Sequence, residues 1–385
     1  MTINLVPRIG GAFFVLLSMT WAANAHEAHC AKERLRYEAI ELGTLGADGG
    51  YARAVNDRGE LTGASSVSND VGRAFIWDCA NGMSDIGALA DTDYASSGTF
   101  INERGTVIGQ SFSETEVQIF IWDRALGMRA IESGFPLSLN DRGDATFWGA
   151  GGLYLWNAAT GRVLVSDLTG LNAREALVNN WRQLGGYGTT IDSGSTVGYY
   201  IWSARRGTRF LAESTFARDE VYDFNDRGEL LINNYEGTRS VPSIVKPDGS
   251  VQLVGAGETN TFTEAHAFNN RGQVVGLKFT AEQPQQMPYI WTSEQGFRDL
   301  NLLILGHAPT DADAKVGNPA DINDWGWIAA SIAAPGARYS NPALLVPVPA
   351  NNPFYRDLSR LRGPQLCRAL HTLKVRAALR TRTCR

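Results

Sequence analysis

The sequence predicts an all-β protein: a seven-bladed β-propeller of four-stranded antiparallel blades, closed by an N-terminal strand and followed by a basic C-terminal tail. Two repeated phrases and one unmatched strand carry this prediction. The first phrase is an apolar residue, Asn, two polar residues and Gly. Its copies lie at residues 55–59, 101–105, 139–143, 224–228, 268–272 and 322–326, with a degenerate copy at Ile191-Asp192-Ser193-Gly194. Repeats at this spacing are typical of solenoids and propellers.

The first phrase has the chemistry of a hairpin turn. An Asn side chain folds back onto nearby backbone in an Asx-turn. The Gly that ends the phrase then takes the positive φ that a bulged hairpin loop requires. Strand-forming residues follow, as in Thr106-Val107-Ile108. Loss of the Asn56 side chain should therefore cost about 1 kcal/mol, the value of one turn hydrogen bond.

The second phrase is an aromatic and β-branched run that follows each turn and reads as a strand. Its clearest copies are residues 74–77, 119–122, 153–156, 199–202 and 289–291, each ending in Trp. A Gly-containing turn and a further strand complete most units. Each Trp is interpreted as a packing wedge between blades, and the alternative is a ring of sugar-stacking platforms.

The last unit lacks a fourth strand, because Pro347 follows the run at residues 344–346. Residues 39–45 match the fourth strand of the first unit and have no partner of their own. We therefore expect the N-terminal strand to complete the last blade, which protects edges that would otherwise pair with other chains. An open stack would instead need capping units.

The two ends of the chain differ from the repeats. Residues 1–25 form a signal peptide with one charge, Arg8, an apolar run at residues 11–21 and a small-residue cleavage site ending at Ala25. The expected domains are then the signal peptide (1–25), the propeller (26–350) and a basic tail (351–385). This predicts a secreted protein, extracellular or periplasmic, with no transmembrane segment.

Four cysteines, Cys30, Cys79, Cys367 and Cys384, predict two disulfides in an oxidising compartment, with three connectivities open. The preferred pairs are Cys30 with Cys79, across neighbouring blades, and Cys367 with Cys384, which are close in sequence. The alternative ties Cys30 or Cys79 to the tail. The spacing does not resemble a zinc site.

Charge is distributed unevenly. The chain carries −5, but residues 351–385 hold nine Lys or Arg and one acid, which leaves the propeller strongly acidic. Such a ring repels nucleic acid and anionic lipid. Residues 365–380 have the spacing of a basic amphipathic helix, which lies on a membrane or grips an acidic surface, including the protein's own ring. The alternative is a disordered tail with no partner.

Few residues suggest chemistry, and no catalytic or cofactor-binding residue is assigned. His266 occupies an inner-strand position facing the channel and is interpreted as structural rather than as a base. The pairs Asp91/Asp93 and Asp311/Asp313 carry alternate carboxylates but lack the later Gly and Glu of a calcium loop, so no metal is expected. Residues 171–184 are interpreted as an insertion with a short helix, in which Trp181 is a contact residue or a lid.

The repeats resemble the HAF-type extracellular repeat of bacteria. That family alternates Ile-Asn-x-x-Gly-x-x-Val-Gly with Ala-Phe-Leu-Trp and Gly-Met-x-Asp-Leu-Gly. Here the corresponding segments are residues 101–109, 74–77 and 82–87, and the resemblance covers roughly residues 39–349. In this alignment of the repeats, unit four lacks the Asn and unit five lacks the Trp. The resemblance implies secretion and a repeat fold, but no reaction and no cofactor.

Three classes of function remain. The first is a non-catalytic, monomeric binding module that grips a glycan, peptide or protein at the propeller face. The second is a propeller enzyme, a lactonase, lyase or hydrolase, with its site at the central channel. The third is a scaffold whose basic tail performs recognition. Three or more carboxylates and imidazoles converging on one point of the channel would indicate an enzyme.

Overall fold

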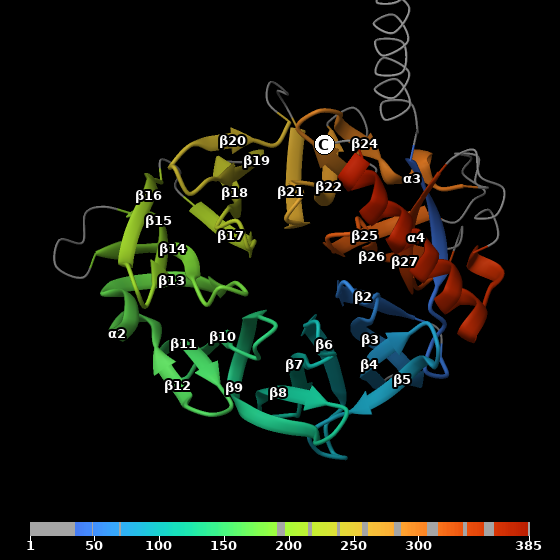
Figure 1. Cartoon of the computed structure of the whole chain (residues 1–385). Coiled ribbons are helices and arrows are strands. Elements are labelled where there is room, and N and C mark those ends of the chain that lie inside the picture. Colours follow the sequence, from blue (N-terminus) through green and yellow to red (C-terminus); the bar gives the residue numbers. More distant parts are fainter. Residues whose placement is uncertain are drawn as a thin grey trace, which may run out of the picture.

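The computed structural model describes residues 35–383, apart from residue 48 and residues 69–70, 191–196, 215–217, 237–238, 256–260, 281–285, 306–314, 334–336 and 350–357. The expected signal segment, Cys30 and Cys384 lie outside the described residues. The described chain is all-β, with short helices and one long C-terminal helix (Figure 1). No helix in this described part has the length and apolarity needed to cross a membrane.

The strands follow one another in antiparallel units of four. The first unit comprises β2 (Gly50–Val55), β3 (Leu61–Ser68), β4 (Val71–Asp78) and β5 (Gly82–Gly87). The second comprises β6 (Ala95–Ile101), β7 (Val107–Phe112), β8 (Val117–Asp123) and the first half of β9 (Gly127–Leu139). The third comprises the second half of β9, β10 (Ala145–Gly149), β11 (Gly152–Asn157) and β12 (Gly161–Leu164). Strand β9 serves two units, because its first half pairs with β8 and its second half with β10.

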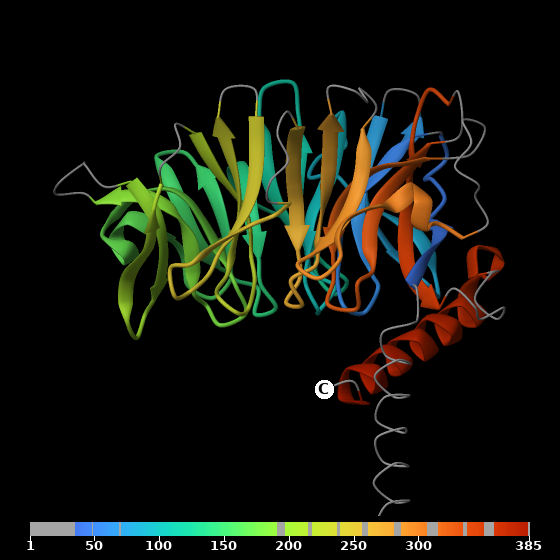
Figure 2. The same cartoon turned by 90° about the horizontal axis from the view of Figure 1, so that it is seen from above.

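The later units repeat this plan. The fourth unit comprises β13 (Leu171–Val178), β14 (Leu184–Thr190), β15 (Val197–Ser203) and β16 (Gly207–Glu213), and the fifth comprises β17 (Arg218–Phe224), β18 (Leu230–Glu236), β19 (Arg239–Val245) and β20 (Val251–Leu253). The sixth unit comprises β21 (Thr261–Phe268), β22 (Val274–Thr280), β23 (Met287–Thr292) and β24 (Gly296–Asp299). The last unit comprises β25 (Lys315–Ile322), β26 (Ile328–Ala333) and β27 (Asn341–Pro349). The units follow one another around a ring, with the first strand of each nearest the central axis (Figures 1 and 2).

The core lies between neighbouring units, where the aromatic and β-branched strands meet. Between the first two units, for example, Ile76 and Ile86 pack against Ile101 and Phe120. The Trp residues that end these strands take part in this packing. Trp77 and Trp291 are buried, and Trp122, Trp156 and Trp202 are partly buried against the same clusters. The packing interpretation is therefore favoured over exposed sugar platforms.

The N-terminal strand completes the last unit, as predicted. Strand β1 (Leu35–Glu41) pairs antiparallel with β27, from Leu35 opposite Pro349 to Glu41 opposite Ala343. Its bounds differ from the expected residues 39–45, because the strand begins four residues earlier and ends at Glu41. Tyr37 and Ile40 are buried by this pairing. Strand β27 continues through Pro347 to Pro349, so the proline does not end it.

The expected helix within residues 171–184 is wrong. Helix α2 (Val165–Thr169) precedes this segment, and residues 171–178 form the inner strand β13. A turn then follows at Asn179, which is the true fourth copy of the repeated phrase. Arg182 takes the positive φ, 58°, that Gly takes in the other copies. The copy proposed at residues 191–194 lies outside the described residues, and unit four has kept its Asn.

The tail is helical and packs on the ring. After α3 (Leu300–Leu303) and the 3₁₀ turn η2 (Leu358–Arg360), helix α4 runs from Gly363 to Thr383 (Figure 2). Four residues of α4 are buried in one cluster with Trp77, Trp327 and Leu344: they are Leu366, Ala369, Leu370 and Leu373. The apolar face of the helix predicted from sequence thus packs on the propeller itself, at the junction of the first and last units.

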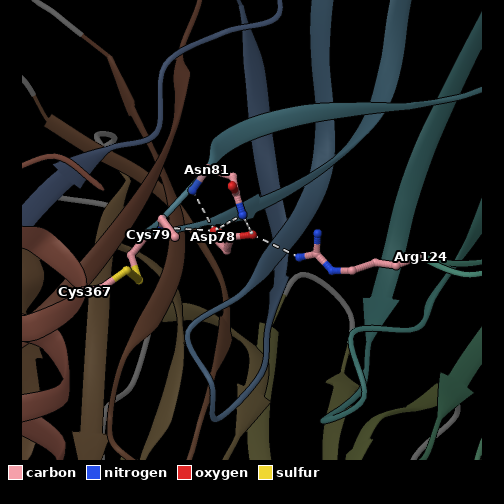
Figure 3. Close-up of a disulfide and its surroundings, with 6 residues drawn as sticks. Asp78, Cys79, Asn81, Arg124 and Cys367 are labelled. Carbon is pink, nitrogen blue, oxygen red and sulfur yellow. Dashed lines mark hydrogen bonds and ion pairs between the residues drawn. A yellow bond between two sulfur atoms is a disulfide. The ribbon is translucent and has the colours of Figure 1, made fainter. Parts of the chain in front are cut away.

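The disulfide pairing expected from sequence is wrong. Cys79, in the turn after β4, is bonded to Cys367 of α4, and their Cα atoms are 5.2 Å apart (Figure 3). Neither Cys30–Cys79 nor Cys367–Cys384 can form at the same time. The turn that carries Cys79 is held by Asp78, which accepts hydrogen bonds from the backbone of Ala80 and Asn81. Helix docking brings the two cysteines together, which sequence proximity could not reveal.

Replacing Cys367 by Ser should lower the free energy of unfolding by about 2–4 kcal/mol, because the bond joins segments 288 residues apart and holds α4 on the ring. Chemical denaturation of the oxidised protein measures the loss. Arg368→Ser, one residue further along the same helix at an exposed position, is the control and should change stability little. Equal stability of Cys367→Ser and the control would contradict a structural role for this bond.

Candidate functional site

The seven turns of the repeated phrase meet around the axis and are joined by their Asn side chains. In each turn the Asn Oδ1 atom accepts backbone hydrogen bonds, as from Arg104 and Thr106 to Asn102, which confirms the predicted Asx-turn. In six of the seven described turns the Nδ2 atom reaches the next unit, whereas that of Asn225 donates to Glu229 in its own unit. Asn56 donates to the carbonyl of Asn102 at 2.9 Å, and Asn323 donates back to the carbonyl of Asn56 at 2.9 Å. The same link joins Asn102 to Asn140, Asn140 to Asn179, Asn179 to Asn225 and Asn269 to Asn323.

The residue after each Asn forms a second ring. Its backbone N–H donates to the side-chain oxygen of the equivalent residue in the next unit, and the chain of bonds returns to its start: Asp57 to Glu103, Glu103 to Asp141, Asp141 to Asn180, Asn180 to Asp226, Asp226 to Asn270, Asn270 to Asp324 and Asp324 to Asp57. Sequence reasoning treated these residues only as polar. The restriction to Asp, Glu or Asn was the signal that it missed.

Replacing Asn102 by Ala should cost about 2–4 kcal/mol, more than the 1 kcal/mol expected of an isolated turn. The side chain is buried, and its loss leaves two backbone N–H groups and the carbonyl of Asn140 without their partner. Thermal or urea unfolding measures the difference. Asn81→Ala is the control, because Asn81 bonds to Asp78 in an exposed turn. A loss of only about 1 kcal/mol for Asn102→Ala would mean that the side chain contributes no more than one isolated turn hydrogen bond.

A β-bulge in every inner strand lines the channel above these rings. The register of each inner strand shifts at one residue before its turn, which leaves an extra residue unpaired and re-aims its side chain. The register of β25 also shifts between Val316 and Pro319. The extra residues are Arg53, Thr99, Leu137, Arg174, Tyr222, His266 and Ala320. Six of them lie three residues before the Asn of their turn. In β13 the bulge lies two residues earlier, at Arg174.

Four of the bulged residues and one amide form the candidate site. A cavity of about 390 Å³ is lined by Arg53, Thr99, Tyr222, His266 and Asn318, one from each of five consecutive units around the ring. His266 Nδ1 lies 2.9 Å from the carbonyl of Pro319. Because a carbonyl only accepts, Nδ1 carries the proton and Nε2 is left as an acceptor. Burial lowers the pKa of His266, so the ring is neutral near pH 7. Among the described residues, Arg53 donates no hydrogen bond and forms no ion pair.

Two partly buried carboxylates, Asp223 and Asp321, also line this cavity. With His266 they make three converging titratable groups, the number that the sequence argument required of an enzyme. Both carboxylates already bind backbone. Asp223 accepts from the N–H groups of Phe224 and Phe268, and Asp321 from those of Ile322 and Val55. They join inner strands of adjacent units, which gives them a structural role.

Burial raises the pKa of several carboxyl groups along the channel: Asp57 to about 6, Glu103 to about 7, Glu175 to about 7, Asp223 to about 7 and Asp321 to about 6. A folded-state pKa above the unfolded value means that the folded protein binds protons more tightly. These groups therefore stabilise the fold below about pH 4, and this contribution is lost as the pH rises through 6 to 7.

The melting temperature should accordingly fall between pH 5 and pH 8. Glu175→Gln should flatten this dependence, because the amide oxygen still accepts from Val221 but no longer titrates. Exposed Glu213→Gln is the matched control and should leave the slope unchanged. A melting temperature that rises over this interval, or equal slopes for the two variants, would show that these carboxylates are not protonated in the fold.

The other sequence candidates do not join this site. The Asp93 carboxylate accepts a hydrogen bond from Ser111 within a buried turn, so it supports the loop. Asp311 and Asp313 lie outside the described residues. Trp181 is 67% exposed at the tip of the fourth turn and is not among the residues that line the candidate cavity. Within the described ranges, no group of three His, Cys, Asp or Glu side chains is arranged to hold a metal ion.

This ring of antiparallel four-stranded sheets around a bulge-lined channel makes the protein a β-propeller. No protein-family model matches the chain, and no curated protein is significantly similar to it in sequence. A streptogramin B lyase structure is similar with a TM-score of 0.48 and 10% identity, over 81% of this chain and 98% of the lyase. The β-propeller domain of the Trilobed protease from Pyrococcus furiosus has a TM-score of 0.48 and 11% identity, over 80% and 98%. TolB from Acinetobacter baumannii has a TM-score of 0.38 and 11% identity, over 78% and 64%. These values bear on no residue or activity of this chain.

Proposed function

We propose that the protein is a secreted, non-catalytic binding module: a closed, seven-bladed propeller of HAF-type repeats that binds a sugar unit in its channel. Support for seven blades and closure comes from the returning hydrogen-bond ring at Asp57 and from the pairing of β1 with β27. Secretion is supported by the signal-like N-terminus and by the Cys79–Cys367 bond, since disulfides persist in oxidising compartments.

The observation that carries the proposal is the set of bulged side chains at the cavity of about 390 Å³. Arg53 and Asn318 offer donors, Thr99 offers a hydroxyl, and His266 Nε2 offers an acceptor. Tyr222, 36% exposed, presents a ring on which a sugar face can stack. Arg53 and the neighbouring Asp321 offset each other's charge, which suits a hydroxyl-rich ligand without strong charge. The volume lies within the range of small-molecule sites.

A glycan array with the mature oxidised protein, followed by calorimetry on the best ligand, tests the proposal. Arg53→Ala should weaken binding by at least about tenfold, the value of lost charge-assisted hydrogen bonds. Arg104→Ala, at an exposed turn position outside this cavity, should bind like the wild type. Binding that survives Arg53→Ala, or no binding to any glycan, would refute a sugar site in the channel.

An enzyme of the lactonase, lyase or hydrolase type is the second candidate, and the neutral His266 with its acceptor Nε2 is the observation that favours it. In this reading His266 accepts a proton from a ligand held by Arg53. The glycan ligands found on the array would then be consumed over time. Chromatography of ligand incubated with wild type and with His266→Gln distinguishes the two, because only a catalytic His266 makes product formation depend on the imidazole.

A further inference from the structure

Exposed aromatic side chains gather at the mouth of the channel where the inner strands begin, opposite the seven turns. Tyr51 of β2 is 44% exposed, Phe135 of β9 is 58% exposed and Trp148 of β10 is 37% exposed. Trp148 is not one of the tryptophans that end the second repeated phrase, so the repeat does not account for it. Contiguous exposed apolar surface is typical of a binding site.

Phe135 and Trp148 form one aromatic face. They lie directly opposite each other in the ladder between β9 and β10. Side chains in such a pair share one side of the sheet, with their Cβ atoms about 4.5–5.5 Å apart. The third unit therefore presents two adjacent rings to solvent at the channel mouth.

Polar contacts join this face to Tyr51 through the second unit. The Tyr51 hydroxyl lies 3.1 Å from Oγ of Ser97 in β6, and Ser97 lies opposite Gln110 of β7. Gln110 Nε2 donates to the carbonyl of Gly134 at 3.2 Å, next to Phe135. Five uncharged side chains thus form a strip across three units, here called the aromatic strip: Tyr51, Ser97, Gln110, Phe135 and Trp148.

The aromatic strip continues from the channel cavity. Tyr51 precedes Arg53 by two positions in β2, and Ser97 precedes Thr99 by two positions in β6. Arg53 and Thr99 both line the cavity. Two residues of a strand span about 6.6 Å, a distance comparable to the length of one sugar unit in a chain. A glycan whose terminal unit fills the cavity therefore meets the strip with its next unit.

The rim at the other end of the cavity is acidic instead. Glu220 and Glu264 precede the bulged Tyr222 and His266 by two positions. Burial and the nearby charge of Glu220 raise the pKa of Glu264, so the two carboxylates lie close to each other. Carboxylates repel sugar acids and offer no apolar face to a sugar ring. The uncharged strip therefore suits a chain without charge.

We propose that the protein binds a neutral oligosaccharide, with its terminal unit in the channel cavity and the following units on the aromatic strip. This inference rests on the proposed function and adds the length and charge of the ligand to it. Tyr51 stacks on the second unit, and Phe135 and Trp148 stack on the unit beyond. The Ser97 hydroxyl and the Gln110 amide offer hydrogen bonds between these rings.

A glycan array followed by calorimetry tests the inference with the mature oxidised protein. The probes are neutral mono- to tetrasaccharides of glucose, galactose, mannose and N-acetylglucosamine. Trisaccharides that bind should do so about tenfold more tightly than their own monosaccharide. Phe135→Ala should remove about fivefold to tenfold of trisaccharide affinity, and the loss should not extend to the monosaccharide. Trp181→Ala is the control, because its exposed ring lies at the opposite mouth, and it should bind like the wild type.

Equal affinity for mono- and trisaccharides, or an equal loss in Trp181→Ala, would overturn this inference and leave the channel site in place. No binding of any neutral glycan would overturn the proposed function as well. A wild-type dimer that Phe135→Ala dissociates in size-exclusion chromatography would make the strip a contact between copies and would also overturn the inference. Melting of Phe135→Ala establishes that it folds, and Phe135→Leu gives the same readout while it retains an apolar side chain.

Discussion

Replacing Gly59 by Val is expected to destabilise the protein by about 3–5 kcal/mol. Gly59 has a φ of 83°, a conformation that a β-branched residue adopts only under strain. A Cβ atom there would also lie 2.4 Å from Cζ3 of Trp327. Trp327 cannot withdraw easily, because it is 2% exposed and the ammonium of Lys374 from α4 lies 4.8 Å from its ring centre. Overpacking of this kind adds to the backbone strain.

Gly143→Val separates the two causes. Gly143 occupies the same place in the third turn with a φ of 84°, but no atom lies within 4 Å of its Cβ position. This control should therefore show only the strain, about 1–3 kcal/mol. Chemical denaturation of both variants provides the comparison. Equal losses would mean that contact with Trp327 contributes nothing, and no loss in either would contradict the turn geometry.

Deleting residues 26–45 is expected to have the largest effect, because the deletion removes β1 from the last unit. Tyr37 and Ile40 leave two core clusters, and all of β27 becomes an exposed edge. Exposed edges template pairing with other chains. The truncated protein should aggregate or lose cooperative unfolding, as followed by light scattering and differential scanning calorimetry.

Deletion of residues 26–34 alone, which spares β1, is the control and should melt like the mature protein. Where the longer deletion gives no folded protein, Ile40→Ala keeps the question measurable. This side chain is 1% exposed, and its truncation should cost about 2–4 kcal/mol. An unchanged melting temperature after removal of residues 26–45 would show that β1 does not hold the last unit.

Local sequence patterns predicted most of the fold, because each repeat contains the residues that favour its own turn and strands. Asn56 and Gly59 have the side-chain and backbone preferences of a hairpin turn. The apolar, β-branched and aromatic run at residues 74–77 has those of a buried strand, and both predictions are confirmed. The fourth turn was misplaced for a local reason as well: Arg182 occupies the position at which the pattern requires Gly.

The candidate sites were less accessible to such reasoning. A β-bulge changes the direction in which a side chain points, and the residues around Arg53 and His266 contain no sequence signal for the bulges found there. Strand register and the neighbouring units decide this, and these arise from long-range pairing.

By itself the sequence determined the all-β class, the repeat, the turn chemistry and the N-terminal strand that completes the last unit, because these follow from short-range preferences repeated many times. Tertiary contacts alone fix the partner of Cys79, the docking of α4, the hydrogen bonds that join the turns and the residues that line the channel cavity. Each of these depends on segments that meet in space after folding. Sequence separation, 288 residues for the disulfide, carries no information about such contacts.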